Sequence, residues 1–168
     1  MKKLITVILI GVSFTSCTDH ARSFINKFEN EDFTEFKNAG IHFRGADQEG
    51  NHILMVSETL QNNIENNRGP IVGKVDRKTN EIKETSLRLL RDSSNVDVAK
   101  AKQLALKFLP YKVFGLTVDS NLHVFVMLYE TDRGPHLARF SEPEYLKTAD
   151  VFKRKWRHLR GKWHKAKD

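Results

Sequence analysis

Few of the side chains that carry chemistry in proteins stand here at a spacing that predicts catalysis. The seven histidines form neither an HxxxH nor an HExxH motif, and with one cysteine a structural zinc site is not expected. No serine occupies a GxSxG elbow, and no glycine-rich loop could cradle a phosphate. Glu58 and Glu130 would be paired by an internal repeat, but a site would need them on adjoining strands. We therefore expect a non-enzymatic protein without metal or cofactor.

The single cysteine, Cys17, follows a stretch with the plan of a secretory signal peptide. Lys2 and Lys3 precede an apolar run over residues 4–12, and small polar residues follow it. The run is about half of the roughly 20 residues that a membrane-spanning helix needs. A lone thiol in an oxidising compartment cannot form an internal disulfide, whereas acylation would remove it. An ordinary signal peptide with an incidental cysteine is the alternative.

Thr15, Ser16 and Cys17 resemble the lipobox of bacterial lipoproteins, in which a cysteine after small residues is acylated and becomes the new N-terminus; Phe14 stands where leucine is usual. The resemblance implies a signal peptide over residues 1–16 and a lipidated N-terminus with a short tether over residues 17–23. Two or three acyl chains, such as palmitate, would give stable anchoring. Because Thr18 rather than aspartate follows the cysteine, the resemblance also implies the outer membrane of a bacterial cell envelope, facing the periplasm.

The rest of the chain has the composition of a folded domain. An apolar share of 39% and 11 phenylalanines argue against disorder, and we expect one α+β domain over residues 24–168. The formal charge of +7 is unevenly placed, because Lys and Arg far outnumber Asp and Glu after residue 144. Nucleic acid is a poor partner for an exported protein despite this basicity.

Hydrophobic periodicity predicts helices packed on an antiparallel sheet. Apolar residues recur at helical spacing over residues 19–38, around a break near Asn30, with Gly40 as a natural stop. Residues 96–109 form the clearest helix, which Pro110 ends. Turns rich in Asp and Asn separate the expected strands. These strands cover residues 41–44, 53–56, 71–75, 81–87, 113–118, 122–129 and 136–140.

The order of these elements recurs, which favours an internal duplication. Shifting residues 41–59 by 72 positions places them on residues 113–131 without a gap, so that Asp47 meets Asp119. Both copies follow a helix, and both continue to Arg-Gly-Pro and a further strand. The hypothesis gives two units, each a helix and three strands, over residues 24–87 and 96–141. Two unrelated hairpins with common turn residues are the alternative.

Such tandem units are similar to the small α+β modules of bacterial envelope proteins, of the PepSY or beta-lactamase-inhibitor-protein kind. Residues 74–82 resemble the strand–turn–strand that closes a PepSY unit, with Asn80 where glycine is usual. The resemblance covers only part of the chain. It implies a protein that binds or inhibits other proteins, often peptidases, although a fold alone does not define a function.

The tail over residues 145–168 is basic and holds both tryptophans, and its apolar residues recur every three or four positions, which predicts an amphipathic helix. Such a helix could lie on an anionic membrane surface, or bind an acidic protein or glycolipid phosphates. Alternatively, its apolar face packs on the sheet and its charges are solvated. After Gly161 the chain could instead form a short strand. The candidate residues of this surface are Lys153, Arg154, Lys155, Trp156, Arg157, Arg160, Lys162 and Trp163.

These features favour a lipid-anchored envelope protein that binds a protein or an envelope component. A membrane-surface structural role through the basic aromatic tail is one alternative. An inhibitor or immunity-like lipoprotein, which would form a stoichiometric complex with one protein, is the other.

Overall fold

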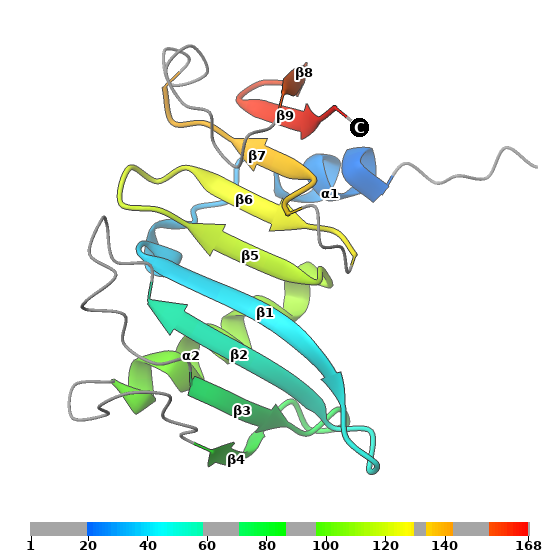
Figure 1. Ribbon diagram of the computed structural model, residues 1–168, viewed down its shortest axis with the longest axis vertical. Helices are drawn as coiled ribbons and strands as arrows, with labels where there is room; N and C mark the ends of the chain where they lie inside the picture. The colour runs from blue at the N-terminus through cyan, green and yellow to red at the C-terminus, as the bar shows by residue number, and fades with distance from the viewer. Residues whose placement is uncertain (1–19, 59–70, 87–96, 130–133, 143–154, 168) are drawn as a thin grey trace, which may run out of the picture.

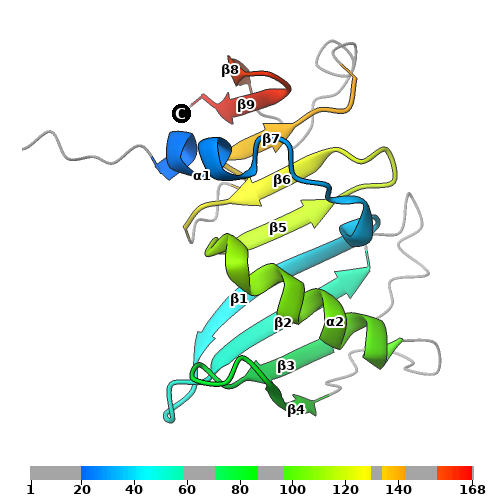
Figure 2. The ribbon, with the colours of Figure 1, turned by 180° about the vertical axis from the view of Figure 1, so that it is seen from behind.

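The helices of this protein lie on one face of an antiparallel sheet. The computed structural model describes residues 20–58, 71–86, 97–129, 134–142 and 155–167. Figure 1 views the sheet from the face without helices, and Figure 2 views it from the face that the helices cover. The α+β class expected from the sequence is therefore confirmed.

Residues 20–86, the first half, contain a helix, a short 3-10 turn and four strands. Their bounds are α1 His20–Phe28, η1 Thr34–Phe36, β1 Ala39–Ala46, β2 His52–Glu58, β3 Ile71–Val75 and β4 Ile82–Ser86. Residues 97–167, the second half, contain a helix, a 3-10 turn and five strands. Their bounds are α2 Val98–Phe108, η3 Leu109–Tyr111, β5 Gly115–Val118, β6 Val124–Met127, β7 Leu137–Arg139, β8 Trp156–Arg160 and β9 Trp163–Ala166.

The described strands form one sheet in the order β4-β3-β2-β1-β5-β6-β7-β9-β8. The two halves meet where β1 pairs antiparallel with β5, with Ile41 opposite Leu116 and His42 opposite Gly115. Each half contributes the strands on its own side of this junction. The centre of the sheet is therefore formed by residues more than 70 positions apart.

Each helix covers strands of the opposite half. Helix α2 lies across β1, β2 and β3 (Figure 2). Helix α1 packs instead on the second half, where the ring centroid of Phe24 lies 5.7 Å from that of Trp163 in β9. Both helices form because apolar residues recur at helical spacing and are buried. In addition, Asp97 caps α2 by accepting a hydrogen bond from the backbone N–H of Lys100.

Aromatic side chains fill the core between α1 and the sheet. Tyr111 lies at their centre, with ring centroids 4.8 Å from Phe28, 5.5 Å from Phe33 and 5.8 Å from Phe36. Its hydroxyl donates a hydrogen bond to the carboxylate of Glu31 at 3.2 Å. Burial raises the pKa of Tyr111, and the negative charge of Glu31 raises it further. The tyrosine is therefore a neutral part of the core.

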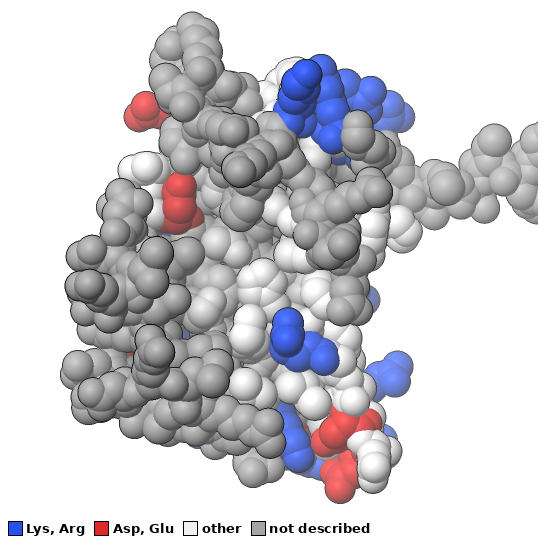
Figure 3. All heavy atoms as spheres, in the orientation of Figure 1, with Lys and Arg blue, Asp and Glu red and all other residues white. Residues whose placement is uncertain are grey.

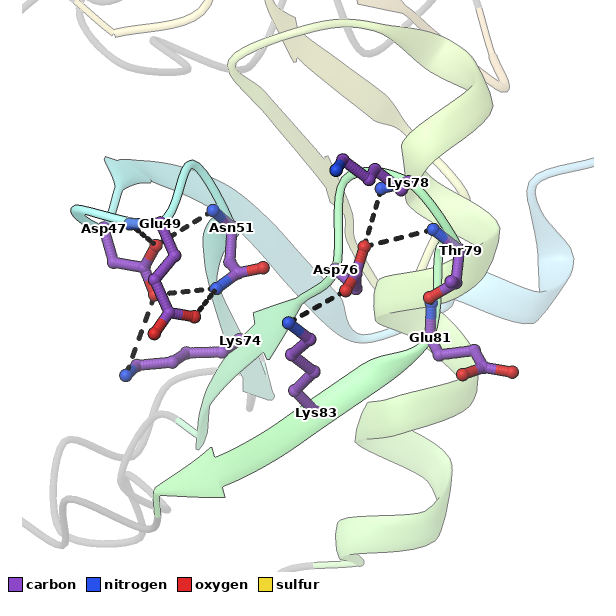
Figure 4. A network of polar contacts seen from close by, with 9 residues as sticks. All are labelled: Asp47, Glu49, Asn51, Lys74, Asp76, Lys78, Thr79, Glu81 and Lys83. Atoms are coloured by element: carbon purple, nitrogen blue, oxygen red, sulfur yellow. Dashed lines mark hydrogen bonds and ion pairs between the residues drawn. The ribbon is translucent and has the colours of Figure 1, made fainter.

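Aspartates anchor the hairpin turns in the first half (Figure 4). The carboxylate of Asp47 accepts hydrogen bonds after β1 and lies 3.8 Å from the ammonium group of Lys74. The carboxylate of Asp76 accepts hydrogen bonds after β3 and pairs with Lys83 at 2.9 Å. Asn80 has a positive φ of 57°, a conformation that asparagine tolerates better than most residues. The expected turn chemistry is confirmed at both places.

The helix expected over residues 19–38 is shorter than predicted, and Gly40 does not end it. The α-helix ends at Phe28, which agrees with the expected break near Asn30, and η1 follows. Asn38, with φ of 61°, is the left-handed residue before β1. Gly40 lies inside β1, where it pairs with Ser57 and Thr117. A glycine within a strand commonly allows another group to approach the backbone closely.

The prediction of a C-terminal amphipathic helix is wrong for the described part of the tail, because residues 156–166 form the β8–β9 hairpin. Trp156 and Trp163 share a helical spacing, yet they lie on different strands and opposite faces of the sheet. Trp163 packs with α1, whereas Trp156 packs with Phe140 on the other face. Gly161 has φ of 54° and turns the chain between the strands. The alternative of a terminal strand after Gly161 is thereby confirmed.

Candidate functional site

The face of the sheet opposite the two α-helices, here called the helix-free face, carries the residues that alternate with the core positions of each strand. Cross-strand pairing places the side chains of its central part side by side. They are Gly40, His42, Ile53, Met55, Ser57, Val72, Gly115, Thr117, Phe125 and Met127. None of these side chains carries a formal charge at neutral pH when His42 is neutral.

His42 lies at the centre of the helix-free face, and its imidazole ring covers the backbone of two glycines, Gly40 and Gly115. A Cβ atom built on Gly115 would come within 2.6 Å of the Nδ1 atom of His42. A Cβ atom built on Gly40 would lie 3.6 Å from its Nε2 atom, and 3.2 Å from the hydroxyl oxygens of Ser57 and Thr117. The two glycines therefore provide the space that this imidazole ring occupies on the sheet.

The environment of His42 favours its neutral form. Burial lowers the pKa of His42, and the positive charge of Arg44 lowers it further. Neither ring nitrogen forms a hydrogen bond with a described residue, whereas the Ser57 hydroxyl donates to the carbonyl oxygen of Gly40 at 3.2 Å. An activated nucleophile requires its base within hydrogen-bond reach. In the described geometry, Ser57 and His42 therefore do not form a nucleophile–base pair.

Toward β8, the helix-free face ends in a cluster of aromatic rings around Phe140. Its ring centroid lies 5.7 Å from His123, 5.7 Å from Trp156 and 5.2 Å from His164. The Nδ1 atom of His123 accepts a hydrogen bond from the backbone N–H of Ser141 at 3.0 Å, which requires that nitrogen to be unprotonated. Burial lowers the pKa of both His123 and His164. The cluster joins the hairpin to the sheet.

The β8–β9 hairpin carries exposed basic side chains, including several of the candidates taken from the tail. Lys155, Arg157, Arg160 and Lys162 are exposed. Trp156 is half-buried, and Trp163 is fully buried in the core. Lys153 and Arg154 lie outside the described residues. Packing of the tryptophans on the sheet, one of the alternatives drawn from the sequence, is thus confirmed for this pair.

An internal repeat would pair the carboxylates of Glu58 and Glu130. The strands that precede or contain these residues, β6 and β2, are not neighbours in the sheet. Glu58 ends β2, and Glu130 lies outside the described residues, after β6. Strands β1 and β5 lie between β2 and β6, so the adjoining arrangement that an acid–base site needs is absent from this part of the sheet. Among the described residues, no group of three or more His, Cys, Asp or Glu side chains could hold a metal ion.

Sequence reasoning missed the centre of the helix-free face. Gly115 falls within an expected strand, and glycine inside a strand is a signal of close approach. Its partner could not be identified, because β1 and β5 pair across the two halves. No helix among the described residues is long and apolar enough to cross a membrane. No family model, curated protein or solved structure matches the chain.

Proposed function

We propose that this chain is a lipid-anchored protein of the bacterial cell envelope that binds a protein partner through the helix-free face. The N-terminal sequence supports the anchor, since Cys17 follows a short apolar run and small residues. Acylation of Cys17 would hold the domain at the outer membrane, on the periplasmic side. The domain would act there by binding and not by catalysis.

The arrangement at His42 is the observation that carries the binding proposal. Both described α-helices lie on the opposite face, so among the described residues it is the strands that form this surface (Figure 2). Its centre combines a flat neutral ring over two glycines with half-buried Met55 and Met127 on the flanking strands. Cores of protein interfaces are depleted in charge and enriched in aromatic residues and methionine. Methionine also adapts its shape to a partner surface.

The same arrangement suits an inhibitor or immunity-like binder. The centre of this surface is uncharged, with Arg44 and Lys74 at its border. An uncharged centre without a concave pocket is complementary to an apolar protein surface rather than to an ion or a small polar ligand. In Figure 3, uncharged residues form a white area beside the grey atoms. Lys and Arg side chains gather at the upper end, over β8 and β9, and others lie within the white area and at the lower end, next to Asp and Glu. We infer a partner with an apolar patch that one copy of this domain covers.

We further propose that the two halves are tandem units related by duplication. Asp47 and Asp119 occupy equivalent turns, in which each carboxylate accepts a hydrogen bond from the backbone N–H four residues later, at 2.9 Å in both cases. The residues at the same place in these turns, Gly50 and Leu122, both have positive φ, 81° and 62°. The junction of β1 and β5 and the exchange of helices between halves are consistent with this origin.

A crosslinking experiment on native membranes tests the binding proposal. The full chain is expected to recover one protein in stoichiometric amount. Met55→Lys, which adds a charge beside His42, should abolish that recovery. Leu106→Lys on the exposed side of α2 is the matched control and should leave it unchanged, since Leu106 is 39% exposed on the other face.

Two outcomes would reject the helix-free face as the binding surface. One is that Met55→Lys recovers the same protein as the unaltered chain while circular dichroism shows that both are folded. The other is that no protein is crosslinked to the unaltered chain at low or high salt.

A further inference from the structure

The outer end of the sheet is a basic surface that the proposed protein-binding face does not use. No Asp or Glu occurs between residues 155 and 167. We call this surface the basic hairpin, and it consists of Lys155, Arg157, Arg160, Lys162, Lys165 and Lys167. Lys155 and Lys167 are adjacent at the open end, where the backbone N–H of Lys167 donates to the carbonyl oxygen of Lys155 at 2.8 Å.

Among the described residues, most of this charge has no ion-pair partner. Arg157 on β8 stands directly opposite Lys165 on β9, and neither forms an ion pair with a described residue. Like charges directly opposite on neighbouring strands are destabilising. Of the basic hairpin, only Arg160 forms an ion pair with a described residue, Glu29 of α1, at 2.8 Å. The hairpin therefore presents a concentrated positive charge to whatever lies outside the domain.

The basic hairpin is attached to the helix that begins beside the proposed anchor. Arg160 bonds to Asn26 and Glu29 of α1, at 3.3 Å and 2.8 Å. Helix α1 begins at His20, only three positions after Cys17. A fully extended chain of that length spans about 10 Å. From His20 to Asn26 the helix rises about 9 Å. Asn26, to which Arg160 bonds, therefore lies at most about 19 Å from the anchored residue, a little over two Debye lengths at physiological salt.

The strand register also places the like-charged pair, Arg157 and Lys165, on the face of the sheet where α1 lies, and α1 begins beside the proposed anchor. Lys165 pairs with Leu137, a core residue, so Lys165 and the opposing Arg157 belong to the face on which α1 lies. His42 lies on the other face. A surface that meets the charge pair would therefore leave the helix-free face accessible.

We propose that the basic hairpin rests on the anionic headgroups of the membrane that holds the acyl chains, and that this contact orients the helix-free face away from the lipid. The inference rests on the proposed anchor at Cys17. Trp163 is fully buried and Trp156 packs on Phe140, so neither indole is free to insert among acyl chains. The contact is electrostatic: each Lys or Arg at an anionic surface strengthens binding about fivefold, and salt weakens it.

Amine labelling of the full-length protein, purified from native membranes with its N-terminus intact, tests this contact. The protein is reconstituted on vesicles of phosphatidylcholine alone or mixed with phosphatidylglycerol. On the mixed vesicles at low salt, Lys155 and Lys167 should be labelled at least about fivefold more slowly than on neutral vesicles, and high salt should remove the difference. Lys100 and Lys102 on α2 are the internal controls and should be labelled equally on both.

Arg157→Glu is the decisive variant, because it creates an opposite-charge pair with Lys165 and so favours the folded hairpin. It removes two units of charge, which weakens the electrostatic contact by roughly 25-fold, and we expect the protection to be lost. Lys102→Glu makes the same change of net charge on α2 and should leave the protection intact.

Three outcomes would overturn the inference. If the protein co-floats with both kinds of vesicle and the lysines of the basic hairpin are labelled at equal rates on both, the membrane anchor is retained and the electrostatic contact is rejected. If the protein binds neither kind of vesicle, the anchor and the contact are both rejected. If a co-purifying acidic protein protects the same lysines before reconstitution, the surface belongs to that protein.

Discussion

The imidazole ring of His42 on β1 lies where a side chain at Gly115 on β5 would have to be. A Cβ atom at residue 115 would come within 2.6 Å of the Nδ1 atom of His42, closer than side-chain carbons approach such atoms. This contact joins the two halves of the chain at the centre of the sheet. It also determines the shape of the centre of the helix-free face.

Gly115→Ala is expected to lower the free energy of unfolding by about 1 to 3 kcal/mol, because the added methyl group forces the His42 ring to move. Urea denaturation followed by circular dichroism measures the loss. In a His42→Ala background the same substitution should cost much less, since the obstructing ring is gone. An equal loss with and without His42 would show that this ring is not what limits the space.

Trp163→Ala is expected to destabilise the domain by about 3 to 5 kcal/mol, because a large, fully buried side chain is removed from the core. Trp156→Ala should cost less, since Trp156 is only half-buried. Urea denaturation of the two variants gives the comparison. A smaller loss at Trp163 than at Trp156 would contradict the packing described for α1 and β9.

A fluorescence measurement separates this packing from membrane insertion. In Trp156→Phe, Trp163 is the remaining tryptophan. Its emission should be poorly quenched by acrylamide and unchanged by anionic vesicles. A blue shift on adding vesicles would mean that Trp163 leaves the core for the lipid.

Acidification is expected to destabilise the protein below about pH 6.5, the ordinary pKa of histidine. Burial holds the pKa of His123 and of His164 below that value in the folded state. As the pH falls, the unfolded chain therefore binds more protons than the folded protein. The free energy of unfolding keeps its full value above pH 6.5, and it decreases between the pKa of histidine in the unfolded chain and the lower pKa in the folded protein. Urea midpoints at three pH values measure the trend.

His123→Asn is the matched variant for this pH dependence, because Asn51 occupies the same place in the equivalent turn of the first half. The variant removes one titrating group and should flatten the decline. A stability that rises on acidification, or a decline unchanged by His123→Asn, would contradict the assignment to His123.

Lys83→Gln is expected to raise the pKa of Asp76. Hydrogen bonds from the Lys83 side chain and from the backbone of Lys78 and Thr79 lower that pKa to about 2. The variant removes the largest of these contributions, so the pKa should move toward the ordinary value of aspartate. An NMR titration of the Asp76 carboxyl carbon follows the change. Lys78→Gln, which keeps the backbone hydrogen bond, is the control and should have little effect.

Local turn chemistry made much of the fold predictable. Asp47, Asp76 and Asp119 each accept the backbone hydrogen bonds of a tight turn, and this signal is contained within five or six residues. The strands on either side of these turns lie where the sequence places them, within a few residues. Helix α2 was also predictable, because its cap and its apolar spacing are local features.

The order of strands and the proposed binding surface were not predictable in the same way. The pairing of His42 with Gly115 joins residues far apart in the chain, and neither residue specifies its partner. The tail shows a related difficulty. Trp156, Leu159 and Trp163 have a helical spacing, yet a left-handed Gly161 turns the chain and the tertiary contacts of Trp163 with α1 favour a strand.

The anchor at Cys17 is the claim on which the placement of every surface depends, and it can be measured directly. Mass spectrometry of the N-terminal peptide of protein purified from native membranes should find a chain that begins at Cys17 and carries two or three acyl groups. A mature chain that begins at another residue, or an unmodified thiol at Cys17, would contradict the account.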